Sequence, residues 1–204
     1  DQRTLGLRLG RWISVNGTGW RFEGLTQGDL NPERRAALSS AARQLLERSV
    51  GAKPVWFEGE YWWLVPESAV GELLAVAAEG ACAWTRPGLL LLPGDERALR
   101  WSWSIDARGC QRLSGSAGAG ELTRAGDAWL YVDAITRQIG RIDHELAPGL
   151  IGELLSQPPL AASMVPAFIA RHAAQWPAAL PRPRQLVVEQ PPAEPPLPIL
   201  TLHQ

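Results

Sequence analysis

The sequence has few of the residues that build disulfide scaffolds, metal sites and membrane spans. It contains two cysteines, Cys82 and Cys110, three histidines and a single methionine, Met164. Two thiols that form no Cys-x-x-Cys pair are typical of a reducing compartment, so we expect a cytoplasmic protein. Apolar runs such as Leu89–Leu92 are far too short to cross a bilayer.

An initiating methionine and a secretion signal are also missing. The chain begins at Asp1, and residues 1–10 are charged where a signal peptide would have a basic patch followed by an apolar run. We therefore expect a piece of a longer protein whose N-terminus was removed by processing or cloning.

Charge of one sign is not in excess. The net charge is −1 and the pI is about 6.4, with Lys53 as the only lysine beside 19 arginines. Strong unaided nucleic-acid binding is driven by basic side chains that neutralise phosphates, so this balance argues against it. We expect the preference for arginine over lysine to come from the codon usage of a GC-rich genome; the alternative is selection for bidentate phosphate contacts.

What the sequence does have is a normal apolar content and many tryptophans. Hydrophobic residues make up 46 % of the 204 positions, enough for one large domain or two small ones. Ten tryptophans stand beside three phenylalanines and two tyrosines. Tryptophan is common both in cores and in binding grooves, because its side chain has a large apolar area and an N–H donor. We expect most of the ten tryptophans to lie in the core.

Apolar periodicity and turn residues predict an α+β fold with mostly antiparallel strands, three or four helices and an extended proline-rich C-terminal tail. Helices are predicted at 31–48, 66–79, 150–157 and 163–176. Strands are predicted at 12–15, 20–22, 55–57, 61–65, 82–85, 89–92, 99–105, 111–113, 129–132 and 138–142, with turns at 16–19, 58–60 and 133–137.

The expected domain organisation has three parts. Residues 1–143 form a β-rich α+β domain, and residues 144–176 form a helical segment packed on it. Residues 177–204 contain eight of the 17 prolines, which cannot sit inside a helix or a central strand. They are predicted to be an extended connector, which is either an end that lies on another domain or a linker towards one.

No catalytic, cofactor or metal site is predicted. The glycine-rich stretch Gly115–Gly120 lacks the Gly-Lys-Ser/Thr ending of a phosphate loop and is interpreted as a mobile hairpin loop. Asp143-His144-Glu145 are consecutive, so their side chains diverge and a solvated loop is expected. A Gly-x-Ser-x-Gly nucleophile elbow does not occur. Cys82 lies in an apolar stretch and is expected in the core.

One possible interaction surface is predicted, and it is aromatic. Adjacent residues of a strand face opposite sides, so Trp62 and Trp63 cannot both point into one core. Trp101 and Trp103 alternate with serines and share one strand face. The predicted surface residues are Tyr61, Trp62, Trp63, Trp101 and Trp103. Packing against other domains is the commoner role of such rings, and stacking on bases or sugars is the alternative.

The last third of the chain resembles the segment just ahead of the motor in bacterial Swi/Snf-type helicase-like ATPases. The first matching piece is a hairpin with the pattern Tyr-hydrophobic-Asp, turn, Gly-x-hydrophobic, which is Trp129–Asp133 followed by Gly140–Ile142 here. A helix that ends in Leu-Leu-x-x-Pro-Pro follows at Leu154–Pro159, and a second helix follows at Val165–Trp176. The last pieces are Leu180-Pro181 and the pattern Pro-x-Pro-x-Leu-x-Leu at Pro196–Leu202. The resemblance covers about residues 127–202; the zinc-finger-like cluster of some relatives and both motor lobes are missing.

The resemblance implies a non-catalytic N-terminal accessory region of an ATP-dependent DNA translocase. Residues 177–204 would be the linker towards that motor, which is missing from this chain. ATP and magnesium would belong to the motor, and the partners would be the motor domains of the same chain. DNA would be contacted through the parent protein. No helicase catalytic residue is carried over to this chain. The alternative is a free-standing Trp-rich binding module for peptide or carbohydrate.

Overall fold

The computed structural model of the chain describes residues 4–8, 10–15, 19–24, 31–50, 55–57, 60–84 and 89–185. Within these residues the protein combines helices and strands, and most strand pairs are antiparallel. The predicted α+β class is therefore confirmed. The described part holds five α-helices, where the sequence predicted three or four. The predicted proline-rich tail is described only as far as residue 185.

The N-terminal strands form two small sheets. One is an antiparallel hairpin of β2 and β3, and the other has the order β1-β5-β4. Both hairpins predicted in this region are confirmed, although the central residues of their predicted turns, 16–18 and 58–59, lie outside the described residues. These strands are β1 (Gly6–Leu7), β2 (Gly10–Val15), β3 (Gly19–Gly24), β4 (Val55–Phe57) and β5 (Glu60–Leu64).

The single helix predicted at 31–48 is in fact two helices. Helix α1 spans Pro32–Ala36 and begins at Asn31, whose side chain accepts a hydrogen bond from the backbone N–H of Arg34. Helix α2 spans Ser40–Val50. The chain breaks between them because the Ser39 hydroxyl accepts from the backbone N–H of Ala42 and starts a new helix. A serine that caps a second helix is hard to distinguish from a mid-helix serine by apolar periodicity alone.

Helix α3 covers one face of the main sheet. It spans Val70–Ala78, after a 3-10 turn at Glu67–Ala69 that opens the predicted 66–79 helix. Its buried side chains pack with Leu91, Leu130, Val132 and Ile139 of the sheet and with Leu45 of α2. The same helix is tied to α2 by an ion pair between Arg48 and Glu72 with an N–O distance of 3.3 Å. This layer of two helices over a sheet is the larger core of the protein.

The main sheet has six strands in the order β11-β12-β13-β7-β6, with β8 paired beside β13. Strands β7 and β8 pair with β13 in parallel, whereas β11, β12 and β13 form an antiparallel meander. Two of these strands, β8 and β11, were not predicted. The strands are β6 (Cys82–Trp84), β7 (Leu89–Pro93), β8 (Arg97–Ala98), β11 (Glu121–Ala125), β12 (Ala128–Asp133) and β13 (Gln138–Asp143).

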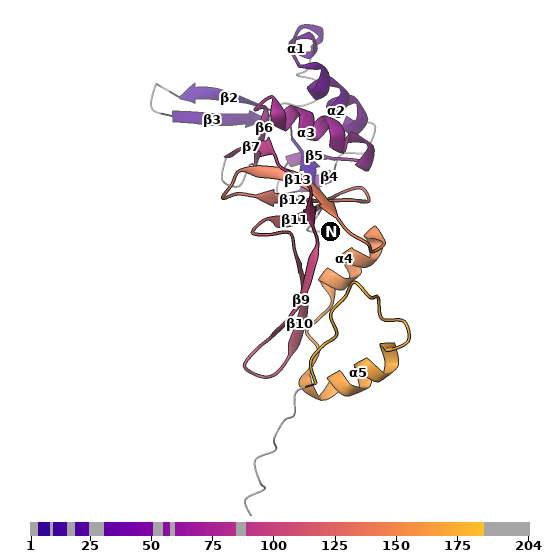
Figure 1. Cartoon of the computed structure of the whole chain (residues 1–204). Helices are drawn as coiled ribbons and strands as arrows, with labels where there is room; N and C mark the ends of the chain where they lie inside the picture. Colours follow the sequence, from indigo (N-terminus) through magenta and orange to yellow (C-terminus); the bar gives the residue numbers. More distant parts are fainter. Residues whose placement is uncertain are drawn as a thin grey trace, which may run out of the picture.

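A further hairpin, β9 (Arg100–Ile105) with β10 (Gln111–Ser116), extends away from the main sheet toward the C-terminal helices (Figure 1). Strand β10 is longer than the predicted 111–113 because Gly115 and Ser116 pair with Trp101 and Arg100. The interpretation of Gly115–Gly120 as a loop is therefore wrong in its first two residues, whose backbone is in the ladder. The glycines correctly predicted a turn between β10 and β11, but the turn begins later than predicted.

The C-terminal helices lie along the β9–β10 hairpin. Helix α4 spans Pro148–Ser156, and Leu160 then pairs with Gln111 through two backbone hydrogen bonds of 2.7 Å. Helix α5 spans Val165–His172 after a 3-10 turn at Ala162–Met164, so the predicted helix 163–176 ends earlier than expected. None of the helices in the described ranges is both long enough and apolar enough to cross a membrane.

Candidate functional site

The tryptophans on β5 do not form an exposed platform. Trp63 is buried, with 6 % of its surface exposed. Trp62 is half-buried and lies against Gly6 of β1, where a Cβ would be 3.1 Å from Cε3 of its ring. Among the described residues, its indole Nε1 is buried without a hydrogen-bond acceptor. The side chain of Tyr61 lies outside the described part of the chain.

Trp101 and Trp103 do share one face of β9, as the alternation with serine predicts. Both are half-buried, and they pack on a small core made by Leu113, Leu154 and Leu180. Trp103 stands directly opposite Leu113 in the β9–β10 ladder. The inner face of this hairpin is therefore covered by the chain's own C-terminal segment.

We call residues 177–185 the strap, because they run across the inner face of the hairpin after α5. The indole N–H of Trp103 donates to the backbone oxygen of Pro181 over 2.7 Å. The indole of Trp176 donates to the backbone oxygen of Leu180 over 2.9 Å. Pro183 is buried. Two tryptophan N–H groups thus hold consecutive carbonyls of one extended segment.

Gln111 fastens the end of the strap. Its side chain is fully buried, donates through Nε2 to the backbone oxygen of Arg184 at 2.6 Å, and accepts at Oε1 from the backbone N–H of Arg184 at 2.9 Å. A glutamine amide can make this two-point contact with the backbone N–H and C=O of one residue because it carries both a donor and an acceptor. Sequence reasoning missed Gln111, since a single glutamine at the start of a strand gives no signal of its partner.

Beside the strap is an open groove of about 260 Å³. Trp103 and Leu113 line it from the hairpin, and Phe168 lines it from α5. Its remaining lining comes from the connection between α4 and α5: Gln157, Pro158, Pro159 and Leu160. The lining has aromatic, proline and leucine side chains and one amide, and it has no charged residue.

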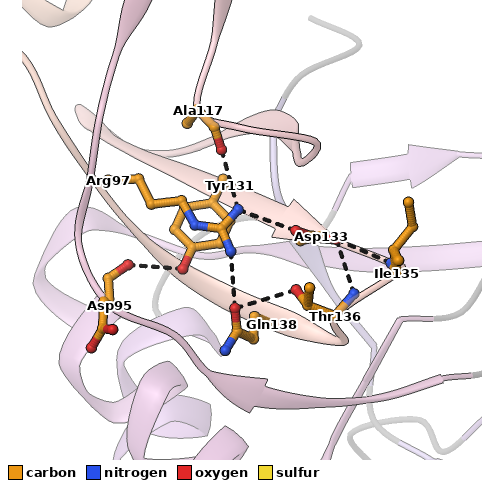
Figure 2. A network of polar contacts seen from close by, with 8 residues as sticks. All are labelled: Asp95, Arg97, Ala117, Tyr131, Asp133, Ile135, Thr136 and Gln138. Atoms are coloured by element: carbon orange, nitrogen blue, oxygen red, sulfur yellow. Dashed lines mark hydrogen bonds and ion pairs between the residues drawn. The ribbon is translucent and has the colours of Figure 1, made fainter.

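Figure 2 shows a polar network around Tyr131. It lies on the face of the main sheet that carries Trp129 and Tyr131, opposite the face whose Leu130 and Val132 pack on α3. The guanidinium of Arg97 lies over the ring of Tyr131, with Cζ 3.9 Å from the ring centroid. The same group donates to Asp133 Oδ2 at 3.1 Å, to Gln138 Oε1 at 2.9 Å and to the backbone oxygen of Ala117 at 3.2 Å. One arginine therefore links β8, the β10–β11 turn, β12 and β13.

Tyr131 and Asp133 connect this network to the neighbouring backbone through further hydrogen bonds. The buried Tyr131 hydroxyl donates to the backbone oxygen of Asp95 at 2.8 Å. Asp133 Oδ1 accepts from the backbone N–H groups of Ile135 and Thr136, at 3.0 and 3.1 Å. The aspartate thus closes the β12–β13 turn while its second oxygen holds Arg97.

The titration of both residues is shifted. Burial raises the pKa of Tyr131 above its usual value, against the opposing effect of Arg97. The hydrogen bond from the backbone N–H of Thr136 lowers the pKa of Asp133, with Arg97 as a further cause. Asp133 is therefore ionised and Tyr131 is neutral near pH 7. Since both Asp133 oxygens and the Tyr131 hydroxyl already have partners, the network acts as a structural clamp.

His144 and the two cysteines are the remaining side chains that could take part in catalysis or metal binding. His144 places Nδ1 2.7 Å from the backbone oxygen of Leu146, and the described ranges contain no group of three His, Cys, Asp or Glu side chains that could hold a metal ion. Both cysteines are free thiols. Burial raises the pKa of Cys82 to about 11, so this thiol is a poor nucleophile near neutral pH. Cys82, which was expected in the core, is half-buried and packs against the larger core.

Comparisons with known proteins give no relative to reason from. No family model, no curated protein and no solved structure matches this chain.

Proposed function

We propose that this chain is the non-catalytic N-terminal accessory region of a larger ATP-dependent, helicase-like DNA translocase of the bacterial Swi/Snf type. The observation that carries the proposal is the mutual fit of the residues that bear the resemblance. The Tyr131 ring lies where Gly140 has no side chain, because a Cβ there would be 2.6 Å from Cε1 of the ring. Asp133 closes the turn between them. Three motif residues that depend on one another support the resemblance better than three independent matches.

The later pieces of the resemblance also have connected places in the fold. Helix α4 precedes Pro158-Pro159, and the next residue, Leu160, pairs with β10. Helix α5 follows, and Leu180-Pro181 are then held by Trp176 and Trp103. A succession of segments that packs on one hairpin supports the interpretation as one accessory unit ahead of a motor.

In this proposal the chemistry belongs to the motor. ATP and magnesium would bind the motor lobes, and this region would pack on them, regulate them or guide DNA towards them. The net charge of −1 supports at most weak, salt-sensitive DNA binding by the region alone. The two free thiols support a reducing, cytoplasmic location.

The first test is to sequence the natural gene beyond the codon for Gln204. We expect a Gly-Lys-Ser/Thr phosphate loop and an acidic helicase box downstream. A stop codon at that point would contradict the proposal and leave a free-standing protein.

A biochemical test separates the accessory role from an independent nucleotide-binding role. The isolated chain should hydrolyse no ATP, and its DNA affinity should fall steeply between low and physiological salt. Calorimetric titration with ATP and magnesium should give no binding heat. Tight ATP binding by the isolated chain would overturn the proposal.

The alternative, a Trp-rich module for peptide or carbohydrate, is favoured in its peptide form by the contact between Trp103 and Pro181. Sugar stacking needs an open ring face, whereas Trp101 and Trp103 are both half-buried. Fluorescence quenching with a defined stoichiometry in a free-standing protein would support this alternative.

A further inference from the structure

The outer face of the β9–β10 hairpin differs in chemistry from its inner face. Side chains alternate along a strand, and residues that pair across the ladder share a face. The inner face packs on α4 and the strap through Trp101 and Trp103, and Figure 1 shows α4 and α5 beside the hairpin on one side. Every residue of the outer face is exposed. These residues are Arg100, Ser102 and Ser104 of β9 and, opposite them on β10, Ser116, Ser114 and Arg112.

The outer face is positively charged in a chain whose net charge is −1. Residues 97–116 contain four arginines and a single acidic residue, Asp106. Asp106 accepts hydrogen bonds from two backbone N–H groups of the loop at the hairpin tip, both at 2.9 Å. Among the residues that the structure describes, the guanidinium groups of Arg100 and Arg112 form no ion pair. The face therefore presents two charges that no described carboxylate neutralises.

The serines between these arginines supply hydroxyl groups with weak internal partners. The Ser114 hydroxyl donates to the backbone oxygen of Ser102 at 3.3 Å and lies 3.4 Å from the Ser102 hydroxyl. The Ser104 hydroxyl donates to the backbone oxygen of Arg112 at 3.4 Å. These distances are long for an O–H···O bond, which is usually about 2.7–2.8 Å. A phosphate oxygen is a stronger acceptor and would take these donors readily.

The spacing of the charges suits a nucleic-acid backbone. Arg112 stands opposite Ser104, so Arg100 and Arg112 are four positions apart along the ladder, about 13 Å. That distance is about the rise of four base pairs of duplex DNA. A two-stranded ribbon is also narrow enough to lie along a major groove about 12 Å wide. Arginine and serine are common phosphate ligands, and the outer face has no asparagine or glutamine to read adenine.

We propose that the outer face of the β9–β10 hairpin binds the phosphate backbone of duplex DNA without sequence preference. Arg100 and Arg112 would each neutralise a phosphate, and the serines between them would donate to phosphate oxygens. The inference rests on the proposed function for the choice of DNA as the polyanion. It names the element through which the accessory region would guide DNA towards the motor.

The test is fluorescence anisotropy of a fluorescein-labelled DNA duplex of about 20 base pairs, titrated with the whole chain at about 50 and about 200 mM salt. We expect saturable binding at the lower salt concentration and weaker binding at the higher one. The double variant Arg100→Gln, Arg112→Gln should weaken binding roughly tenfold or more at the lower salt. It should also reduce the slope of log K against log salt by about 2, because two phosphate contacts are lost.

Matched variants separate the hairpin face from net charge and from the fold. The control Arg137→Gln, Arg171→Gln removes the same charge from exposed positions outside the hairpin and should keep the salt slope of the wild type. Ser102→Asp puts a negative charge on the face without removing an arginine and should also weaken binding. Thermal unfolding of each variant shows whether a loss of binding reflects unfolding.

Four results would overturn the inference. They are no saturable binding by the wild type, equal binding by the wild type and the arginine variant, an unchanged salt slope in that variant, and tighter binding of labelled polyglutamate, which would assign the face to an acidic protein. If Glu189→Gln, Glu194→Gln binds DNA and the wild type does not, the chain's own C-terminal residues cover the face, and a DNA contact in the native chain is overturned as well.

The failure of this inference is distinguishable from the failure of the proposed function. A motor encoded downstream, together with unchanged DNA binding by the arginine variant, would overturn the hairpin contact alone. A stop codon after Gln204 would overturn the proposed function and leave a measured DNA contact standing.

Discussion

Arg97 lies over Tyr131 with its guanidinium carbon 3.9 Å from the ring centroid, while the same guanidinium holds Asp133 at 3.1 Å. The ring beneath it is fully buried. This stack connects the β12–β13 hairpin to β8, a strand that the sequence pattern did not predict. The hairpin is therefore held from outside by a residue more than 30 positions away in the chain.

Replacing Arg97 with lysine should destabilise the protein. Lysine keeps the charge but cannot form the planar fork that reaches Asp133, Gln138 and Ala117 together. We expect a loss of about 2–3 kcal/mol in the free energy of unfolding, from hydrogen bonds and the cation–π contact. Urea unfolding followed by tryptophan fluorescence measures it. The control Arg112→Lys, on the exposed face of β10, should change stability by less than about 0.5 kcal/mol.

Replacing Gly140 with alanine should also destabilise the protein. The new Cβ would lie 2.6 to 2.8 Å from three atoms of the Tyr131 side chain, whose ring is itself confined beneath Arg97. Overpacking of this kind costs about 1–3 kcal/mol. The matched control is Gly149→Ala in α4, where a Cβ meets nothing within 4 Å and where alanine should add about 0.5–1 kcal/mol of stability. Thermal unfolding that ranks the two variants in the opposite order would contradict the packing.

The elements that could be predicted were those with local signals. Asparagine and proline at the start of α1, and apolar periodicity in α3 and α4, gave helices of the right type. The two-residue strand β8 and the strand β11 could not be predicted, because their identity depends on pairing with distant strands. Pairing partners are set by packing across the whole sheet, which a window of neighbouring residues does not contain.

The candidate site was predicted only in part. The alternation around Trp101 and Trp103 correctly placed both rings on one face of β9. The strap that covers them could not be foreseen, since the contacts to Pro181 and Arg184 span more than 70 residues. Adjacent tryptophans predicted opposite directions for Trp62 and Trp63, but not that Gly6 would receive Trp62.

Acid should weaken the network through Asp133. The folded-state pKa of this carboxyl lies below its ordinary value, so the unfolded chain takes up the proton first as the pH falls. Its contribution is complete above the unfolded pKa of about 4 and is lost as the pH falls through the lower, folded pKa. The variant Asp133→Asn should be less stable than wild type at pH 7, with a difference that shrinks towards pH 2. Urea unfolding across this range measures it, and a constant difference would exclude Asp133 as the source.

The grip of Gln111 on the strap predicts how the strap resists proteolysis. Replacing Gln111 with leucine keeps most of the side-chain volume but removes both hydrogen bonds to the backbone of Arg184. Two such bonds contribute about 1–2 kcal/mol, which corresponds to a roughly 5- to 30-fold change in the population of the released strap. Trypsin should therefore cut the bond between Arg184 and Gln185 faster by about this factor. Mass spectrometry of timed digests identifies the fragment that ends at Arg184.

The design of this digest separates local release from global unfolding. The bond after Arg182 precedes Pro183 and resists trypsin, so Arg184 is the cleavage position within the strap that reports its release. The control Ser114→Ala lies on the exposed face of β10 and should leave the rate unchanged. If Gln111→Leu accelerates cleavage at Arg124 and Arg141 of the main sheet as much as at Arg184, the whole protein has been destabilised. Selective acceleration at Arg184 instead shows that the strap opens while the sheet stays folded, as a segment held by a few long-range hydrogen bonds should.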